Sequence, residues 1–463
     1  MTELAPNTQN FLKSAEEIVG SKGIVMGDDL RGRSVDPLRV MPTLAPVLVR
    51  PASTEEVSKV LADCHKRKQR VVFHGGRTGV AGGAYTSADE IVLSLERMTK
   101  IEEIDLAAQV AVVQAGCSIE ALQNAAAEHG LFYPIDLGSK GTATVGGTIS
   151  TNAGGNHVLR WGMTRANVLG LEAVLADGTI VSSLNKLVKN NTGYDLKQYF
   201  IGSEGTLGVV TRAVVRLIPM PKTQSVAFLA VETIDNVIKL LSAARKLPTL
   251  SAFEVLWHDY YKMVAESNTG RRPLPPDWPY YVLVEGRGYH EGIDDQMFEA
   301  FLNDAYEQGL IAEAVLAQSE RQKKDLWHVR EASQVAVQTM YPFVSFDISA
   351  ELRSMEPCVN ECHAAVRKVW PDAKIITFGH LGDNNLHFAI HVGPDTLNLE
   401  HEIDQVVYDV VLKYHGALTA EHGVGQLKRD FLKQHKSAAE FDVMRRIKEA
   451  LDPAGLINHE VMF

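Results

Sequence analysis

Two histidines stand at the ends of a short polar segment that separates two apolar runs. His380 follows Ile375-Ile376-Thr377-Phe378, and His387 precedes Phe388-Ala389-Ile390-His391-Val392. The pattern predicts a hairpin, which would bring the two imidazoles across from each other. Two imidazoles at this spacing can share one metal ion, although histidines in hairpins also serve structural roles. A metal site at this hairpin therefore requires a third ligand.

A carboxylate and a further imidazole occur together in the segment Ala420-Glu421-His422-Gly423-Val424-Gly425. The glycines on the C-terminal side predict a tight turn that presents both side chains. Two histidines and one glutamate leave coordination positions open for substrate oxygens, which is typical of a catalytic metal rather than a structural one. An exposed Glu-His pair without any metal is the alternative interpretation of this segment alone.

Three glycine-rich stretches have the composition of loops that bind anions. The first, residues 74–83, directly follows the apolar run Arg70-Val71-Val72-Phe73; the others span residues 134–155 and 191–211. Glycines let several backbone N–H groups converge on one anion, and Thr78 can add a hydroxyl donor. The first stretch fits neither GxGxxG nor GxxxxGK[ST], and by itself it could be an ordinary glycine-rich turn. Together the stretches predict a large phosphorylated ligand.

Alternating strand and helix patterns supply the elements that must hold these segments. A short strand at 46–51 is followed by the capping box Ser53-Thr54-Glu55-Glu56, an amphipathic helix and a second strand at 70–73. Further strands are expected at 91–95 and 110–113, and a helix at 119–129. The class is mixed α and β.

Glycine usage falls sharply after Pro219-Met220-Pro221, which predicts a domain boundary. We expect a first domain at 1–222 with an N-terminal lead-in, a second domain at 223–424, and a C-terminal segment at 425–463. A length of 463 residues also favours two or three packed units over one.

Composition excludes several classes of protein. A hydrophobic share of 45% and a charged share of 22% are those of a globular chain, and the net charge of -11 makes nonspecific nucleic-acid binding a poor expectation. The four cysteines are too few and too scattered for a disulfide framework. No apolar run is long enough for a transmembrane segment, and the first residues lack the pattern of a signal peptide. These features favour a cytoplasmic protein.

The three glycine-rich stretches, taken in order, resemble the FAD-binding domain of the vanillyl-alcohol oxidase and p-cresol methylhydroxylase superfamily. The resemblance implies an α+β protein with a two-part FAD-binding domain, an α+β substrate or cap domain, and a C-terminal tail that returns to the FAD domain. It implies a pyrophosphate between residues 75–79 and 144–147, with the isoalloxazine facing the second domain. Some members attach the flavin to a histidine of the first loop; this chain has Arg77 there, so we expect noncovalent FAD. The implied cofactor-binding residues are Gly75, Gly76, Arg77, Thr78, Gly79, Gly82, Gly83, Pro134, Asp136, Gly138, Ser139, Thr144, Gly146, Gly147, Ser150, Asn152, Gly154, Gly155, Glu204, Gly208, Val209, Val210 and Asn458.

The chain contains the motif Gly-His-x-Gly-Asp-x-Asn-x-His, with Ala-Glu-His-Gly-x-Gly downstream. With these motifs it resembles the FAD-linked D-2-hydroxy acid dehydrogenases over about residues 40–463. The resemblance implies that His380, His387 and Glu421 bind a divalent ion, with zinc expected and manganese or iron as alternatives. His422 would be the base that accepts the substrate hydroxyl proton, while hydride passes to the flavin. Arg330 would bind the substrate carboxylate.

One position departs from the motif, because Asn384 stands where these relatives usually have glycine. Asparagine tolerates a left-handed turn, so we expect the site to be retained.

The substrate side of the resemblance favours a monocarboxylic acid. Members of the D-2-hydroxyglutarate branch usually carry a lysine just before a strand that reads Tyr-Asp-Leu-Ser, whereas this chain has Ser345-Phe346-Asp347-Ile348-Ser349. They also tend to have asparagine two residues after the second metal histidine, where this chain has Ala389. We therefore favour D-lactate or a longer monocarboxylic acid, although Lys140 or His391 could replace the missing contacts.

Several alternatives remain open at this point. The substrate could be D-2-hydroxyglutarate or D-malate, the enzyme could be an oxidase that uses O₂, or the chain could be a noncatalytic flavin subunit of a glycolate-oxidase-like complex. A dehydrogenase of this kind needs an electron acceptor, which could be a quinone, an electron-transfer flavoprotein or a cytochrome. The resemblance leaves a homodimer open.

Overall fold

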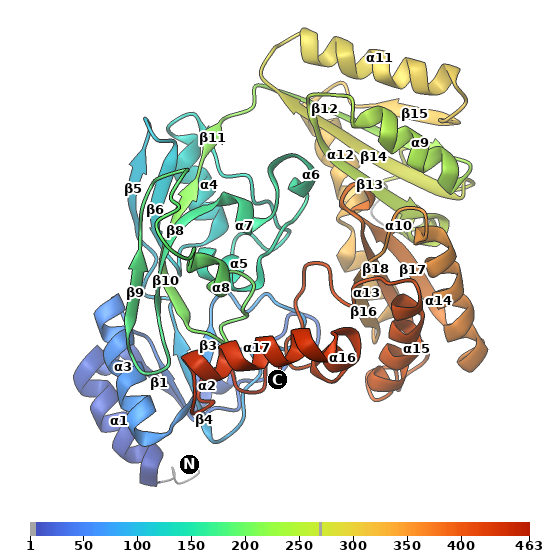
Figure 1. Ribbon diagram of the computed structural model, residues 1–463. Coiled ribbons are helices and arrows are strands. Elements are labelled where there is room, and N and C mark those ends of the chain that lie inside the picture. Colours follow the sequence, from blue (N-terminus) through green and yellow to red (C-terminus); the bar gives the residue numbers. More distant parts are fainter. Residues whose placement is uncertain (1–5, 268–270) are drawn as a thin grey trace. The chain divides into compact units, whose positions relative to one another are not determined.

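The computed structural model describes residues 6–267 and 271–463 (Figure 1). The described chain divides into two compact units. The first unit contains the described residues up to Gly155, Gly162–Met220 and Glu421–Phe463, and the second contains Asn156–Trp161 and Pro221–Ala420. The sequence predicts boundaries after residues 222 and 424, and the units change after Met220 and Ala420. The assignment of Asn156–Trp161 to the second unit has no signal in the sequence. The C-terminal segment belongs to the first unit, so the predicted return of the tail is confirmed.

A four-stranded sheet in the first unit carries the first glycine loop. Its strands are mostly buried, and β3 and β2 both pair in parallel with β4. Beside β3, Val71 forms a parallel bridge with Ile457 of the C-terminal segment. The strand order is β1 (Ile24–Met26), β2 (Val47–Val49), β4 (Glu90–Ser94) and β3 (Arg70–His74).

A second, five-stranded sheet of the first unit is antiparallel throughout. Its central strands are nearly continuous runs of buried residues, which is why they show little alternation in the sequence. The strand order is β5 (Ile101–Asp105), β6 (Val110–Gln114), β10 (Val209–Arg216), β8 (Val168–Val174) and β9 (Ile180–Ser183), and a two-stranded sheet joins β7 (Leu131–Phe132) to β11 (Ile218–Pro219).

Several helices of the first unit begin at a residue whose side chain caps the helix. Ser53 accepts a hydrogen bond from the Glu56 N–H at the start of α3, and this helix buries its apolar side in the main core. The helices are α1 (Pro6–Val19), α2 (Asp28–Arg31), α3 (Thr54–Arg67), α4 (Ile119–Ala127), α5 (Val145–Thr151), α7 (Thr164–Asn167), α8 (Lys197–Phe200), α16 (Arg429–His435) and α17 (Ala438–Leu451), with a 3₁₀ turn η1 (Ser21–Gly23).

A seven-stranded antiparallel sheet forms the second unit (Figure 1). Three of its strands, β17, β18 and β16, are neighbours at one end of the sheet; His387 lies in β18, and His380 directly follows β17. The strand order is β15 (Glu313–Leu316), β12 (Thr223–Val231), β14 (Tyr280–Gly288), β13 (Leu250–Trp257), β17 (Lys374–Gly379), β18 (Asn385–His391) and β16 (Val344–Ser349).

Helices cover this sheet and bury a core of aromatic and aliphatic side chains that includes Phe228, Tyr261 and Tyr281. The helices are α6 (Val158–Trp161), α9 (Ile234–Ala244), α10 (His258–Ala265), α11 (Ile293–Glu307), α12 (Glu320–Arg330), α13 (Ser333–Met340), α14 (Met355–Val369) and α15 (Glu400–Lys413), with a 3₁₀ turn η2 (Leu381–Asp383). Within the described residues, no helix is both long enough and apolar enough to span a bilayer.

Candidate functional site

The first two glycine-rich loops pack directly against each other in the first unit. A Cβ added to Gly76 would lie 2.1 Å from the Thr142 carbonyl oxygen, and one added to Gly75 would lie 2.8 Å from Thr144 Oγ1. The Gly76 contact is with backbone, so this position requires glycine, and a side chain at Gly75 would displace the Thr144 hydroxyl that accepts from the Gly147 N–H. The two loops that the sequence assigned to one phosphorylated ligand are therefore adjacent.

Backbone donors of the first loop are available to such a ligand. Within the described residues, the N–H groups of Gly75, Gly76, Thr78 and Gly79 donate to no protein acceptor. The Arg77 side chain turns to the Ser34 carbonyl, to which Nη1 donates at 2.7 Å. An anionic phosphate accepts from converging N–H groups of this kind, so the loop fits the pyrophosphate of FAD.

The remaining predicted cofactor residues lie in the glycine-rich stretches or next to them in the structure. Val209 and Val210 are buried core residues, and Asn458 is engaged by the backbone: its Oδ1 accepts from the Phe73 N–H at 3.0 Å, and its Nδ2 donates to the Glu204 carbonyl at 2.8 Å. The others fall into four groups: Gly82 and Gly83 close the first loop; Pro134, Asp136, Gly138 and Ser139 follow β7; Thr144, Gly146, Gly147, Ser150 and Asn152 cap or form α5, ahead of Gly154 and Gly155; and Gly208 precedes β10.

Glu204 contacts the segment that carries Glu421 and His422. Its carboxylate accepts the backbone N–H groups of Val424 and Gly425, both at 2.7 Å. Burial raises the pKa of Glu204 even though these two hydrogen bonds favour the ionised form. The sequence assigned Glu204 to the cofactor; in the structure its side chain fixes the turn that follows the Glu421-His422 pair.

The histidine hairpin predicted from the sequence is confirmed. β17 and β18 pair in antiparallel fashion with Phe378 opposite His387, and the rings of His380 and His387 lie 5.5 Å apart between centroids. Asn384 adopts a left-handed conformation with φ of 70° at the end of η2. Asparagine therefore fills this turn in place of the expected glycine, as predicted.

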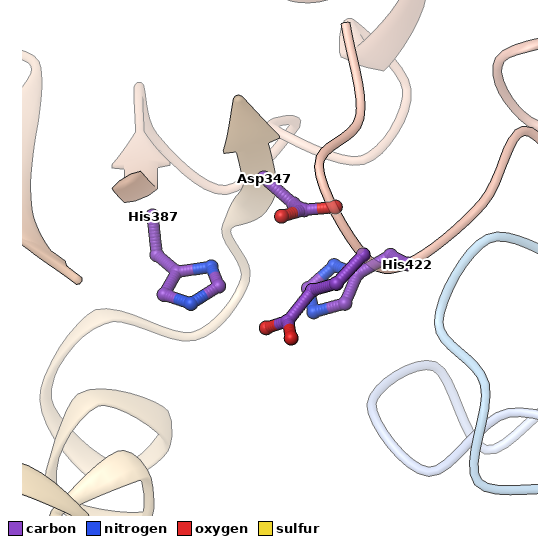
Figure 2. Close-up of side chains that lie close together, drawn as sticks. Asp347, His387 and His422 are labelled. Carbon is purple, nitrogen blue, oxygen red and sulfur yellow. The ribbon is translucent and has the colours of Figure 1, made fainter. Parts of the chain in front are cut away.

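Four potential metal ligands lie together at the end of this sheet: Asp347, His387, Glu421 and His422 (Figure 2). Each offers one ligand atom, and these atoms all lie within 4.8 Å of one another. Three of the four come from the sequence motifs. His380, the remaining predicted ligand, is outside this group and is held by other partners.

Asp347 is the member of the group that sequence reasoning missed. It lies fully buried in β16, directly opposite His387 of β18. Its Oδ2 accepts from Thr419 Oγ1 at 2.8 Å and from the Ala420 N–H at 3.1 Å, so it fixes the residues that lead into Glu421. A carboxylate between the apolar residues Phe346 and Ile348 was the only signal in the sequence.

Arg330 and His380 share a second buried carboxylate, Glu254 of β13. Arg330 Nε donates to Glu254 Oε2 at 2.7 Å, and His380 Nδ1 lies 2.8 Å from Oε1. Arg330 is 7% exposed, so it is a buried arginine whose charge is paired with that of Glu254. Burial would raise the pKa of Glu254, but its interactions with His380 and Arg330 outweigh burial and hold this pKa below its ordinary value.

Both residues offered as alternatives for binding a second substrate carboxylate have partners within their own unit. Lys140 pairs with Asp136 in the first unit at 2.9 Å. His391 Nδ1 lies 2.8 Å from the Pro342 carbonyl oxygen at the far end of β18. Each side chain thus has a local partner of its own.

Comparisons with known proteins agree with this arrangement. Residues 45–183 match the family model "FAD binding domain", and residues 220–461 match "FAD linked oxidases, C-terminal domain". A mitochondrial D-2-hydroxyglutarate dehydrogenase of Bos taurus is 37% identical, over 97% of this chain and 83% of its own. A Schizosaccharomyces pombe protein provisionally named as a mitochondrial D-lactate dehydrogenase is 36% identical, over 93% of this chain and 84% of its own.

Solved structures show the same fold. That of p-cresol methylhydroxylase with substrate bound has a TM-score of 0.79 at 14% identity, over 98% of this chain and 96% of its own. An alkyldihydroxyacetonephosphate synthase has a TM-score of 0.76 at 16% identity, over 99% of this chain and 86% of its own. The adjoining glycine loops, the two matched domains and the relatives that align along the whole sequence lead to one assignment: this chain belongs to the FAD-linked oxidase family that includes D-2-hydroxyglutarate and D-lactate dehydrogenases.

Proposed function

We propose that this flavoprotein oxidises a monocarboxylic D-2-hydroxy acid, such as D-lactate, to the corresponding 2-oxo acid. The observation that carries the proposal is a buried guanidinium, Arg330, that shares the carboxylate of Glu254 with His380, one of the two hairpin histidines. A buried arginine next to metal-type ligands suits a small substrate that offers both a carboxylate and a hydroxyl group. The relatives' names support the D configuration.

The donor set suits a divalent metal. His380, His387 and Glu421 supply two imidazoles and a carboxylate, and zinc accepts this set while keeping a position for a substrate oxygen. The proximity of His387 and Glu421 supports the proposal, with Asp347 nearby as a further carboxylate. Manganese or iron would accept the same donors.

Bound FAD supplies the hydride acceptor, and the metal supplies a Lewis acid for the substrate hydroxyl group. Arg330 binds and orients the carboxylate through its planar guanidinium. His422 accepts the hydroxyl proton, for which a neutral imidazole is suited near physiological pH. Arg77, whose side chain is engaged with the Ser34 carbonyl, supports noncovalent attachment of the flavin.

Apolar surroundings favour a monocarboxylic substrate. Ala389 lies opposite Ser345 in the β16–β18 pair, and it belongs to the same core cluster as Val329, Ala336 and Met340. A second carboxylate placed there would lose hydration without gaining a cationic partner. The alternative substrates D-2-hydroxyglutarate and D-malate draw their support from the name of the 37% identical relative.

The reaction requires an electron acceptor, for which a quinone, an electron-transfer flavoprotein or a cytochrome is proposed. The grouping of His387, Glu421 and His422 speaks against a noncatalytic flavin subunit. A homodimer and a cytoplasmic location stay predictions.

A substrate panel tests the proposal. Purified yellow protein is assayed with D- and L-lactate, D-2-hydroxybutyrate, D-malate and D-2-hydroxyglutarate, using an artificial dye as acceptor. We expect the highest kcat/KM for a monocarboxylic D acid, by at least about tenfold over the dicarboxylates, because a buried unpaired charge costs more than 1.4 kcal/mol. A preference for D-2-hydroxyglutarate would replace the monocarboxylic assignment. Hydrogen peroxide formed in air at the rate of dye reduction would make the enzyme an oxidase.

A further inference from the structure

Glu254 lies where one carboxylate can control two parts of the proposed site. It sits in β13, a central strand of the second unit's sheet, and its side chain is 1% exposed. Its two oxygens hold different partners: Oε2 accepts from Arg330 Nε at 2.7 Å, and Oε1 accepts from His380 Nδ1 at 2.8 Å. The first partner is the proposed carboxylate-binding residue, and the second is a proposed metal ligand.

These contacts define which nitrogen of His380 carries the proton. An ionised carboxylate can only accept, so Nδ1 must donate to Glu254. Arg330 Nη2 lies 3.3 Å from His380 Nε2, and a guanidinium can only donate, so Nε2 must accept. Both neighbours therefore select the tautomer with Nδ1 protonated and the lone pair on Nε2. In this structure the lone pair faces the Arg330 guanidinium, and it would bind a metal in exchange for that contact.

The same carboxylate fixes the plane of the Arg330 guanidinium. Nε is held by Glu254, and Cζ lies 4.9 Å from the centroid of the Phe378 ring. A guanidinium fixed in this way presents its donors in one direction, which reduces the entropy lost when a planar carboxylate binds.

We propose that Glu254 is a positioning residue that prepares both halves of the site, the guanidinium for the substrate carboxylate and the imidazole for the metal. The inference rests on the proposed function and deepens it. It has a specific consequence: one substitution at a residue that touches neither substrate nor metal should weaken the binding of both.

The test compares Glu254→Gln with Glu254→Asp in the FAD-loaded, full-length protein. Glutamine keeps the shape of the side chain but replaces one acceptor oxygen with a donor NH₂ group. This group would face the N–H donor of either His380 or Arg330 and could not accept from it. We expect zinc affinity, measured by competition with a chelator, to fall about 10- to 100-fold, the usual effect of losing the partner of a metal-binding histidine. KM for D-lactate should rise at least about tenfold. Aspartate keeps the charge and should restore part of both.

Glu285→Gln serves as the matched control. Glu285 is also a fully buried carboxylate of this sheet, on the neighbouring strand β14, and it accepts from Ser251, Trp327 and Arg287. Its loss should lower the melting temperature while KM and zinc affinity stay within twofold of wild type. If Glu254→Gln behaves like this control, or if only one of the two affinities changes, Glu254 does not join the two halves of the site.

A readout independent of activity separates this inference from the proposed function. The ¹⁵N chemical shifts of His380 report its tautomer in the wild-type holoprotein and in the aspartate variant, even if glutamine prevents folding. We expect a proton on Nδ1 in both. A proton on Nε2 in the wild type would overturn the positioning role even in an active enzyme. A wild type with the Nδ1 tautomer but no activity towards any 2-hydroxy acid would instead refute the proposed function.

Discussion

His422 is the residue on which the proposed chemistry depends most directly. It follows Glu421 in the turn held by Glu204, and its ligand atom lies within 4.8 Å of those of Asp347 and His387. Because His387 and Glu421 are proposed metal ligands, His422 is the group left to accept the proton of the substrate hydroxyl.

Replacing His422 with alanine should slow flavin reduction by the substrate about 10²- to 10⁴-fold, the range for loss of a general base. FAD and metal contents should stay unchanged, since the proposed ligands remain. Rapid mixing under anaerobic conditions measures the bleaching of the flavin. His391→Ala is the control, because His391 lies at the end of β18, the strand that carries His387, and bonds to the Pro342 carbonyl oxygen. Reduction of the His422 variant at the wild-type rate would exclude it as the base.

Particular residues show how far the sequence could predict the site. His387, Glu421 and His422 were expected together because their motifs have characteristic spacing, and the structure groups them. Asp347 and Glu254 carry no such pattern: each is a single acid in a buried strand, with partners 72 and 126 positions away in Thr419 and His380. Only strand pairing in the folded sheet reveals these contacts, and the roles of all five stay predictions.

Among the structural elements, the glycine turns are the parts most sensitive to change. The turn after His422 passes so close to the first glycine loop that a Cβ on Gly425 would lie 1.8 Å from the Ala81 carbonyl oxygen. Gly425 also has a φ of 56°, a conformation that side chains disfavour. The sequence predicted both glycine segments but could not predict that they touch, because that contact depends on the return of the C-terminal segment.

The Gly425→Ala substitution should lower the free energy of unfolding of the first unit by at least about 1 to 3 kcal/mol, the usual cost of a strained backbone. It should weaken FAD binding as well, since Ala81 belongs to the first glycine loop. Urea unfolding and flavin release measure both effects. Gly193→Ala is the control: its φ is 85°, but a Cβ there has no neighbour within 4 Å of the described atoms. Equal effects of the two substitutions would mean that the close contact adds nothing.

At the scale of the whole molecule, each unit contains a histidine that burial keeps neutral. The pKa of His74 in the first unit is lowered to about 4 by burial, and that of His363 in the second unit is also lowered to about 4. His74 donates from Nε2 to the Ala84 carbonyl oxygen at 2.9 Å and is 2% exposed. Protonation of either histidine therefore costs free energy in the folded state.

Stability should therefore fall as the pH decreases from about 6.5 to 4. In this window the unfolded chain binds a proton at His74 while the folded chain does not, which removes up to about 3 kcal/mol. The partly exposed His363 should contribute less. Melting curves across this range measure the loss, and His74→Gln should flatten the pH dependence for the first unit while keeping the bond to Ala84. An unchanged slope in this variant would assign the acid sensitivity to other groups.

The bridge between Val71 and Ile457 also sets an order of assembly during protein synthesis. β3, which leads into the first glycine loop, is completed by a segment that the ribosome adds after every residue of the second unit. Domains generally fold as their residues emerge, so the second unit can form its sheet while the first still lacks the partner of β3 and the Asn458 contact to Phe73. We therefore expect FAD to bind late in the maturation of this protein, after the second unit has folded.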